Sequence, residues 1–586
     1  MRDYLNIDLA DQTVSRETWT GDQLARAGRY YIAKTMVDRD LAKVDPLSPE
    51  NPLIFSVGPF AGSNMSNANR ISIGCKSPLT GGIKEANAGG TFGFALGQSE
   101  LCGLTLEKAS DDWTVIYITK EGDVSFHDAS RYMGKGVIET AALLHDEFGE
   151  KVSLAICGPV GEYQGLMAGI SMSDPEGRPV RIAARGGVGA VMGMKKVKAI
   201  VCDKHKMPTY HDRRGVMQGV KEYGAKLKED AAVQNLGAKG TALVADVMNS
   251  MGGLPVRNFS GGQLVDSKTE RFRMGGDFIR EQNMERGGVP THACMPGCMI
   301  KCSNIYADKD GNELVSPLEY ETIGLLGTNC GLEDPDDVAK LNMTANDLGI
   351  DTIELGATLA LLMEKGDAEF GDVGFMEAAL EDIRTGTERG QFLSSGAARV
   401  GEHFNIARVP VIKKQAISAY DPRVIEVTGI SMMSTAQGAD HTTGNLPTHD
   451  CEGKSTEELV GESMTVQMLC AAADSVGLCL FGRSVTNINH DLVVGAINDA
   501  IGTELPNTFL MELGVETLAL EEQFNNDAGF GEEDDELPAF FYKENLAPSD
   551  KTARHHAVEV RANRAEWMAN ASAQYGLSNS GADRLY

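Results

Sequence analysis

The 586-residue sequence is poor in basic residues. Its 54 Lys and Arg are outnumbered by 83 Asp and Glu, which gives a formal net charge of -29 at pH 7, and no stretch concentrates the basic residues. A chain with this charge repels phosphate backbones and anionic lipid head groups. We therefore expect no nucleic-acid partner and no membrane partner.

The sequence also has no stretch that reaches the roughly 20 apolar residues of a membrane span. The N-terminus, MRDYLNIDLADQTV, carries charges where an export signal needs an apolar run, so we expect a cytoplasmic protein. The 11 cysteines are an odd number, and most are scattered. In a large chain this favours reduced thiols plus one metal or redox site over a disulfide framework.

Two kinds of segment follow one another along the chain. Up to about residue 205, short apolar runs bounded by turn residues, such as NPLIFSVG, WTVIYIT and VKAIVC, predict strands. From about residue 214, longer patterns such as VAKLNMTANDLG and TIELGATLALLMEK predict helices. We expect an α+β fold, with a sheet-rich domain at 1–212 and two mainly α-helical domains at 213–412 and 413–586.

Two polar stretches are assigned to loops. The Gly- and Pro-containing stretch near 401–424 is taken as the boundary between the two helical domains. The acidic run EEDDE at 532–536 is predicted to be a solvated loop.

The segment CMPGCMIKC gathers Cys294, Cys298 and Cys302 within nine residues. Thiolates are soft ligands that suit zinc or an iron–sulfur cluster, and a closed site of either kind needs a fourth ligand. His292 would complete a zinc site. Three buried core thiols are the remaining alternative, which the Met-Pro-Gly break disfavours because it indicates a loop.

An iron–sulfur cluster would take its fourth ligand from a distant cysteine in a constrained turn. The stretch DSVGLC ends at Cys479 and supplies such a turn, because Gly477 permits a tight backbone there. Cys479 is therefore the candidate fourth ligand.

The stretch AARGGVGAVMG at 183–193 has closely spaced glycines. Successive backbone N–H groups of such a loop can point at a phosphate, and Arg185 adds a planar set of donors. The pattern is not a dinucleotide fingerprint, because Met192 stands at the third glycine position. A tight turn without a ligand is the alternative.

The thiol segment, DSVGLC and the stretch NPLIFSVGPFAGSNMSNANRISIGCKSPLTGGIKEANAGGTFG (51–93) together resemble the aldehyde ferredoxin oxidoreductase family of tungsten- or molybdenum-pterin enzymes. The resemblance continues to ELPAFF near the C-terminus. In that family three clustered cysteines and the cysteine of a distant D-x-x-G-L-C motif hold one [4Fe-4S] cluster. Its usual spacing is C-x2-C-x3-C, whereas this chain has C-x3-C-x3-C. The ligands implied here are Cys294, Cys298, Cys302 and Cys479.

The resemblance assigns two pyranopterins to the sheet-rich domain, which makes it the cofactor-binding domain. Arg185 and Gly186 would contact the pterins and their phosphates, and Arg70 would link the cluster to the pterin electrostatically. Asn87 would help to bind Mg2+ between the phosphates. A surface charge at Arg70 and a turn residue at Asn87 are the alternatives.

Two short stretches, NDLGID and DSVGLC, share the D-x-x-G-L-[DC] frame of this family, one for each pterin. Asn346 stands where the frame expects Asp, so the pterin contact there falls either to a neutral amide or to Asp347. Helix C-terminal punctuation is the alternative for each glycine. The pterin-binding residues implied by the two stretches are Asn346, Asp351, Asp474, Gly477 and Leu478.

The stretches LEYET (318–322) and GADHTTG (438–444) match the segments that place a Glu and a His beside the metal in that family. The resemblance thus implies catalytic roles for Glu321 and His441. The alternatives are a solvated helix carboxylate and a loop histidine with satisfied hydrogen bonds. Thr443 stands where some members carry a pterin-binding Lys.

The function implied is oxidation of an aldehyde to a carboxylic acid, with electrons passed to ferredoxin or to a dedicated iron–sulfur subunit. The implied cofactors are a tungsten or molybdenum bis-pyranopterin, one [4Fe-4S] cluster and Mg2+. One alternative is a reductase of acyl or aromatic thioester substrates within the same family, and another is a zinc-stabilised binding protein without redox activity. A homodimer is one option for the oligomeric state.

Overall fold

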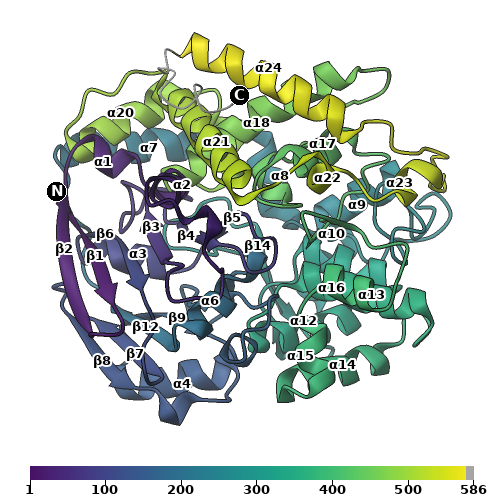
Figure 1. The fold of residues 1–586 in the computed structure, drawn as a ribbon, viewed down its shortest axis with the longest axis horizontal. Helices are drawn as coiled ribbons and strands as arrows, with labels where there is room; N and C mark the ends of the chain where they lie inside the picture. Colours follow the sequence, from purple (N-terminus) through teal and green to yellow (C-terminus); the bar gives the residue numbers. More distant parts are fainter. Residues whose placement is uncertain (576–586) are drawn as a thin grey trace.

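The computed structural model describes residues 1–575. Its N-terminal part contains two six-stranded sheets, coloured purple to blue in Figure 1. The strand order in the first sheet is β2 (Thr13–Trp19), β1 (Arg2–Asp8), β6 (Leu101–Glu107), β3 (Leu53–Val57), β4 (Ile71–Lys76) and β5 (Ile83–Ala88). The order in the second is β11 (Arg181–Ala183), β10 (Ile170–Met172), β9 (Val152–Cys157), β12 (Val197–Asp203), β7 (Thr114–Ile118) and β8 (Val124–Asp128).

One apolar core joins the two sheets. It contains Phe55 and Leu104 from the first sheet and Ile116 and Ile200 from the second. Helices α3 (Phe92–Gln98) and α6 (Val188–Met194) contribute residues to the same core, so strands β3 and β9 are buried along their whole length. The apolar runs NPLIFSVG, WTVIYIT and VKAIVC that predicted strands form β3, β7 and β12, which are buried along all or nearly all of their length.

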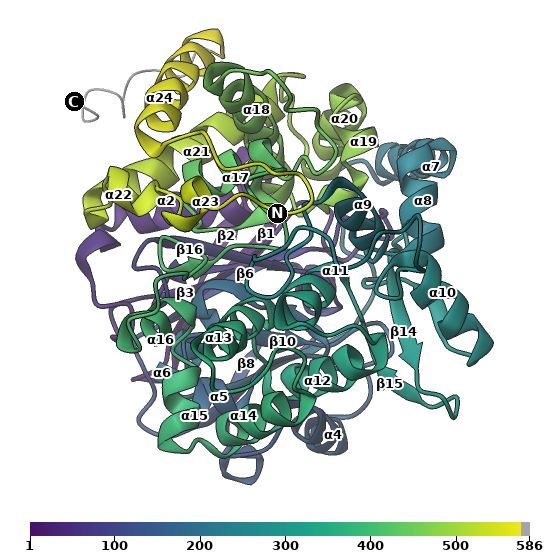
Figure 2. The same ribbon diagram turned by 90° about the vertical axis from the view of Figure 1, so that its right-hand side faces the viewer.

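The rest of the chain is mainly helical, as the teal to yellow elements of Figures 1 and 2 show. The helical patterns VAKLNMTANDLG and TIELGATLALLMEK form α12 and α13, and the expected α+β fold class is confirmed. The longer helices are α7 (Arg213–Glu229), α8 (Ala231–Lys239), α9 (Leu243–Met251), α10 (Gly276–Glu285), α12 (Pro335–Leu348), α13 (Thr352–Lys365), α14 (Val373–Thr385), α17 (Glu426–Ser434), α18 (Thr456–Ser475), α20 (His490–Ile501), α21 (Phe509–Ala528) and α24 (Ala557–Gln574).

The prediction for the acidic run at 532–536 is wrong. Residues Glu532–Asp535 form the short helix α22, and the side chain of Asp535 is buried. It pairs with Lys413 and with Arg561, the latter at 2.5 Å. The two basic partners come from distant parts of the chain, so the run itself gave no sign of them.

The stretch 401–424 was expected to be a boundary, yet residues 415–424 are buried. A single apolar core contains residues from Val160 to Ala571 and so extends across both position 212 and position 412. The domain limits at 212 and 412 remain predictions. Within residues 1–575 no single helix is long and apolar enough to cross a membrane; only α18 and the segment 480–486 together reach that length, and they are bent by 119°.

Candidate functional site

The four cysteines predicted as ligands lie together, although Cys479 is far from the others in sequence. Cys298, Cys302 and Cys479 are buried in one apolar cluster, and Cys294 is half-buried at its edge. Burial raises the pKa of the Cys302 thiol well above its ordinary value, and the three other thiols are close enough to add to this shift. The structure therefore brings together four thiols of the kind that soft metals prefer, and their role as ligands remains a prediction.

Close backbone approaches hold these cysteines in place. A Cβ at Gly58, the residue after β3, would lie 2.0 Å from the carbonyl oxygen of Val476 in the turn before Cys479. A Cβ at Gly89, the residue after β5, would lie 3.1 Å from Sγ of Cys294. Sequence analysis did not select Gly58 or Gly89, because nothing local to either glycine indicates its distant neighbour.

Arg70 and Asn87 connect the cysteines to the first sheet. Arg70 donates from Nη2 to the Asn87 carbonyl oxygen at 3.0 Å and from Nε to the Asn87 side chain, and its Nη1 lies 4.0 Å from Cys479 Sγ. The backbone N–H of Arg70 donates to the Gly477 carbonyl at 3.1 Å. The alternatives of a surface charge at Arg70 and a turn residue at Asn87 are wrong, because Arg70 is half-buried and Asn87 lies within β5.

Asp474 lies at the end of α18 in a buried ionic network. Arg29 of α2 (Gly28–Asp38) donates from Nη1 to Asp474 Oδ2 at 3.3 Å and binds Glu521 through two bonds of 2.6 and 2.8 Å. Burial, together with the nearby Glu85 carboxylate, raises the pKa of Asp474. Leu478, in the turn that follows, is 2% exposed. Arg29 was missed in the sequence analysis because it lies in an ordinary helical pattern.

Arg185 occupies a second buried network. It extends from the one-turn helix Arg185–Gly187 and donates from Nε to Asp351 Oδ2 at 3.2 Å. Its Nη1 donates to Ser418 Oγ at 3.1 Å and to the Ala439 carbonyl at 2.6 Å. The structure thus brings Arg185 and Asp351 together, and it adds Ser418 from the stretch that was taken as a domain boundary.

The predicted residues of NDLGID separate in the structure. Asp351 is the N-cap of α13 and accepts the Ile353 N–H at 2.9 Å. Asn346 is buried in the last turn of α12, and its Nδ2 has no hydrogen-bond partner among residues 1–575. Asp347 points elsewhere: it accepts from the Ile138 N–H at 3.1 Å and pairs with Arg384 at 3.0 Å, which favours Asn346 over Asp347 as the predicted pterin contact.

Glu321 and His441 come from different elements and meet at 3.3 Å, between Glu321 Oε1 and His441 Nε2. Glu321 Oε2 accepts the Ala419 N–H at 2.9 Å, and His441 Nδ1 lies 3.0 Å from Ser418 Oγ. Both side chains are half-buried, so Glu321 is not the solvated helix carboxylate of the alternative interpretation, and His441 is not exposed either. Burial raises the pKa of Glu321, while the adjacent His441 opposes this rise.

A buried ion pair lies beside His441. Lys84 of β5 is completely buried and contacts Asp440 Oδ2 at 2.7 Å. Asp440 in turn accepts the Thr442 N–H at 3.0 Å and so fixes the turn that carries His441. Burial alone would raise the pKa of Asp440, but Lys84 and Arg185 hold it well below its usual range. A Cβ at Gly186 would lie 2.5 Å from Lys84 Cγ, so this lysine also borders the glycine-rich turn.

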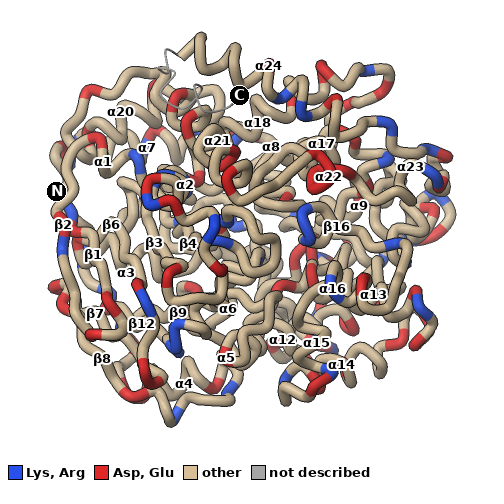
Figure 3. The backbone as a smooth tube through the Cα atoms, in the orientation of Figure 1, with Lys and Arg blue, Asp and Glu red and all other residues tan. Residues whose placement is uncertain are grey.

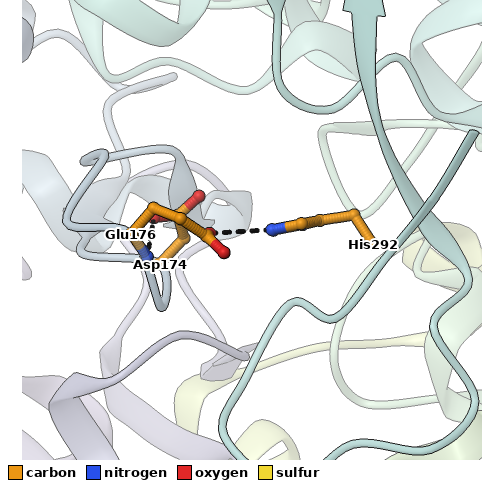
Figure 4. A group of neighbouring side chains, drawn as sticks. All are labelled: Asp174, Glu176 and His292. Atoms are coloured by element: carbon orange, nitrogen blue, oxygen red, sulfur yellow. Dashed lines mark hydrogen bonds and ion pairs between the residues drawn. The ribbon is translucent and has the colours of Figure 1, made fainter. Parts of the chain in front are cut away.

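His292 is engaged away from the thiols. Its Nε2 lies 2.8 Å from Glu176 Oε2, as Figure 4 shows, and its Nδ1 lies 3.3 Å from Arg181 Nη2. Asp174, Glu176 and His292 are close enough to hold a metal ion. However, Asp174 already accepts from the Arg178 guanidinium at 3.0 Å, and two cations border the group. Hydrogen bonds and ion pairs already engage these three side chains, which connect the 174–178 loop to the start of the cysteine segment.

Two models of one protein family together match most of the chain. A family model described as aldehyde ferredoxin oxidoreductase, N-terminal domain, matches residues 4–204, and one described as aldehyde ferredoxin oxidoreductase, domains 2 & 3, matches residues 218–571. The chain belongs to this family. The predicted resemblance is therefore confirmed.

Several curated proteins are similar to this chain over most of their length. The tungsten-containing aldehyde ferredoxin oxidoreductase of Pyrococcus horikoshii is 32% identical, with 95% of this chain and 93% of the relative covered. The Pyrococcus furiosus protein of the same name is 33% identical, with 88% and 87% covered. The WOR-like subunit of the aliphatic sulfonate oxidoreductase of Pyrococcus furiosus is 24% identical, with 88% and 84% covered.

A solved structure shares the whole fold. The active site complex BamBC of benzoyl coenzyme A reductase superimposes with a TM-score of 0.83 over 100% of this chain and 98% of that one. Its sequence identity is 19%, so the likeness concerns the fold.

Proposed function

We propose that this protein is a tungsten- or molybdenum-pterin oxidoreductase that oxidises aldehydes to carboxylic acids and passes the electrons to ferredoxin or to a dedicated iron–sulfur subunit. The observation that carries the proposal is the contact of 3.3 Å between Glu321 and His441, which is joined through Ser418 to Arg185. The names of the 31–33% identical relatives support an aldehyde as substrate.

The residues around this network suit a bound cofactor that both donates and accepts hydrogen bonds. Within residues 1–575, buried Asn346 Nδ2 and Gln415 Oε1 have no hydrogen-bond partner, and Glu321 Oε1 has only its 3.3 Å contact with His441. Leaving such atoms without a partner costs about 1–3 kcal/mol each, so a polar ligand would stabilise the site. Arg185, Gly186, Asp351 and Asp474 would hold the pterins, and Asn87 would help to hold Mg2+.

The cysteines suit a cluster better than a single ion. No three of the sulfur atoms of Cys294, Cys298, Cys302 and Cys479 lie within 4.8 Å of one another. Zinc with bonds of about 2.3 Å to sulfur would need a tighter set. A [4Fe-4S] cluster accepts wider spacing and supplies one-electron transfer.

Oxidation of an aldehyde with water to a carboxylic acid releases two electrons and two protons. The tungsten–pterin group supplies the two-electron chemistry when bound. Glu321 accepts one of the two protons as the aldehyde is oxidised. Burial raises its pKa toward neutral pH, which makes the carboxylate a stronger base. His441, held by Ser418, orients the carbonyl oxygen, and the Lys84–Asp440 pair keeps its turn in place.

The proposal is tested on protein purified without oxygen. We expect about four iron atoms per chain together with tungsten or molybdenum, and reduction of a viologen dye by members of an aldehyde panel. Reduction of an aromatic coenzyme A thioester without any aldehyde oxidation would favour the reductase alternative. Zinc as the only metal would contradict both enzyme functions.

We also propose the three domains at 1–212, 213–412 and 413–586. Limited proteolysis should then cleave first near residues 212 and 412. Cleavage confined to other positions would contradict these limits.

A further inference from the structure

Helix α7 is basic in a strongly acidic protein. Its 17 residues, RRGVMQGVKEYGAKLKE, carry five basic side chains and two acidic ones, against a net charge of -29 for the whole chain. Figure 3 shows acidic residues spread over both halves of the molecule. Within residues 1–575, the five basic side chains of α7 form no ion pair, whereas basic groups elsewhere form 43 such pairs.

The same helix borders the cysteine site. Tyr223 Oη donates to Asn67 Oδ1 at 3.1 Å, and the Asn67 carbonyl accepts the N–H of Cys479 at 2.8 Å. One residue further along the helix, a Cβ at Gly224 would lie 3.1 Å from Met299 Sδ. Met299 directly follows Cys298 and is 37% exposed, so α7 reaches the point where the cysteine loop meets solvent.

Two free lysines flank this point. Lys221 and Lys228 lie three residues before and four residues after Gly224, which places them on the same helix face. Both are exposed, and so is Lys301 in the cysteine loop. The arrangement is an exposed methionine beside the cysteine ligands, with three unpaired lysines around it.

We propose that α7 and the loop 296–301 form the docking surface for an acidic one-electron carrier protein. The inference rests on the proposed function, since the carrier must collect electrons from the cluster. Exposed charges of one sign steer an oppositely charged partner and raise its association rate, and transient redox interfaces bury little area. Met299 supplies the apolar contact at the centre of the surface, and the lysines supply the charged rim.

The test compares two double variants with the same change in charge. Lys221→Glu/Lys228→Glu reverses the charge of two lysines on the proposed docking surface. Lys543→Glu/Lys551→Glu reverses two exposed lysines at and near α23 (Phe540–Lys543), which lies on the other side of the molecule from α7 in Figures 1 and 2. Each holoenzyme is assayed with a purified acidic ferredoxin and with a viologen dye, and ferredoxin binding is also measured directly at several salt concentrations.

We expect Lys221→Glu/Lys228→Glu to raise the KM for ferredoxin about 10-fold and to weaken direct binding similarly. Its salt dependence should be reduced, while the aldehyde KM and turnover with the dye should match the control variant. Unchanged ferredoxin binding in this variant would overturn the proposal. A shift in molecular mass by light scattering, with unchanged ferredoxin binding, would instead assign α7 to self-association and would equally overturn it.

The binding measurement separates this inference from the proposed function. A wild-type protein that binds ferredoxin through α7 but oxidises no aldehyde would contradict the proposed substrate and retain the docking surface. If the wild-type protein oxidises aldehydes with the dye, but Lys221→Glu/Lys228→Glu binds ferredoxin as tightly as the wild type, the docking surface is contradicted and the proposed substrate is retained.

Discussion

The two ends of the candidate site are built in different ways. At the cysteine end, three predicted ligands come from one nine-residue segment, which Gly89 approaches closely, and the fourth comes from a turn that Gly58 approaches closely. At the Glu321 end, the side chains come from several separate segments, of which only Asp440 and His441 share one, and ion pairs and hydrogen bonds hold them. The cysteine end depends on close packing and the Glu321 end on charge pairing, so substitutions at the two ends should have different effects.

The largest effect is expected at the cysteine end. Cys479→Ser removes the one predicted ligand outside the segment, so iron should fall from about four atoms per chain toward zero and the low-temperature EPR signal of the reduced cluster should disappear. Cys470→Ser is the matched control, because Cys470 is a buried cysteine on α18 that is not among the predicted ligands. Full iron in Cys479→Ser would contradict the assignment.

Glu321→Gln should come next, and it tests the charged end alone. The amide preserves the shape but cannot accept a proton, so kcat should fall about 10²–10⁴-fold while iron, tungsten and pterin remain. Because the pKa of Glu321 is raised, wild-type kcat should increase with pH through a value above the ordinary Glu pKa, and this limb should vanish in the variant. An unchanged pH profile would assign the proton transfer to another group.

Lys84→Met should destabilise the protein by about 3–5 kcal/mol, because it leaves Asp440 buried without its partner. The depressed pKa of Asp440 stabilises the fold above the unfolded Asp pKa of about 3.9, and this stabilisation is lost as the pH falls below that value toward the lower pKa of the folded state. The difference in unfolding free energy between Lys84→Met and the wild type should therefore be smaller at about pH 3 than at about pH 7, and denaturant unfolding at both pH values measures it. Lys135→Met removes a surface pair with Glu139 and should cost no more than about 1 kcal/mol.

The smallest effect is expected from Gly58→Ala, which tests shape without touching a ligand. The added methyl group would meet the Val476 carbonyl at 2.0 Å, and the forced shift should cost about 1–3 kcal/mol and loosen iron binding. Gly495→Ala is the control, since nothing lies within 4 Å of its Cβ, and it should stabilise α20 by about 0.5–1 kcal/mol. Equal melting temperatures for the two variants would mean that the close approach does not hold the turn.

The local sequence pattern was sufficient to predict the strands, the helices and part of the candidate site. Buried strands such as β3 and β9 appear in the sequence as short apolar runs, and α12 to α14 as longer periodic ones, because burial and hydrogen bonding act within each segment. Pattern was misleading at 415–424, where a polar stretch is buried, because its partners Arg185 and Glu321 lie elsewhere in the chain.

The sequence by itself determined the fold class, the cysteine segment and, through the family motifs, the candidate site residues. Only the tertiary structure decided which partners those residues have: Arg29 beside Asp474, Lys84 beside Asp440, Ser418 between Arg185 and His441, and α7 beside the cysteines. The physical reason is that a motif records the constraints on a few neighbouring residues. A buried charge instead requires an opposite charge nearby in space, and the chain can supply it from any element that the fold brings close.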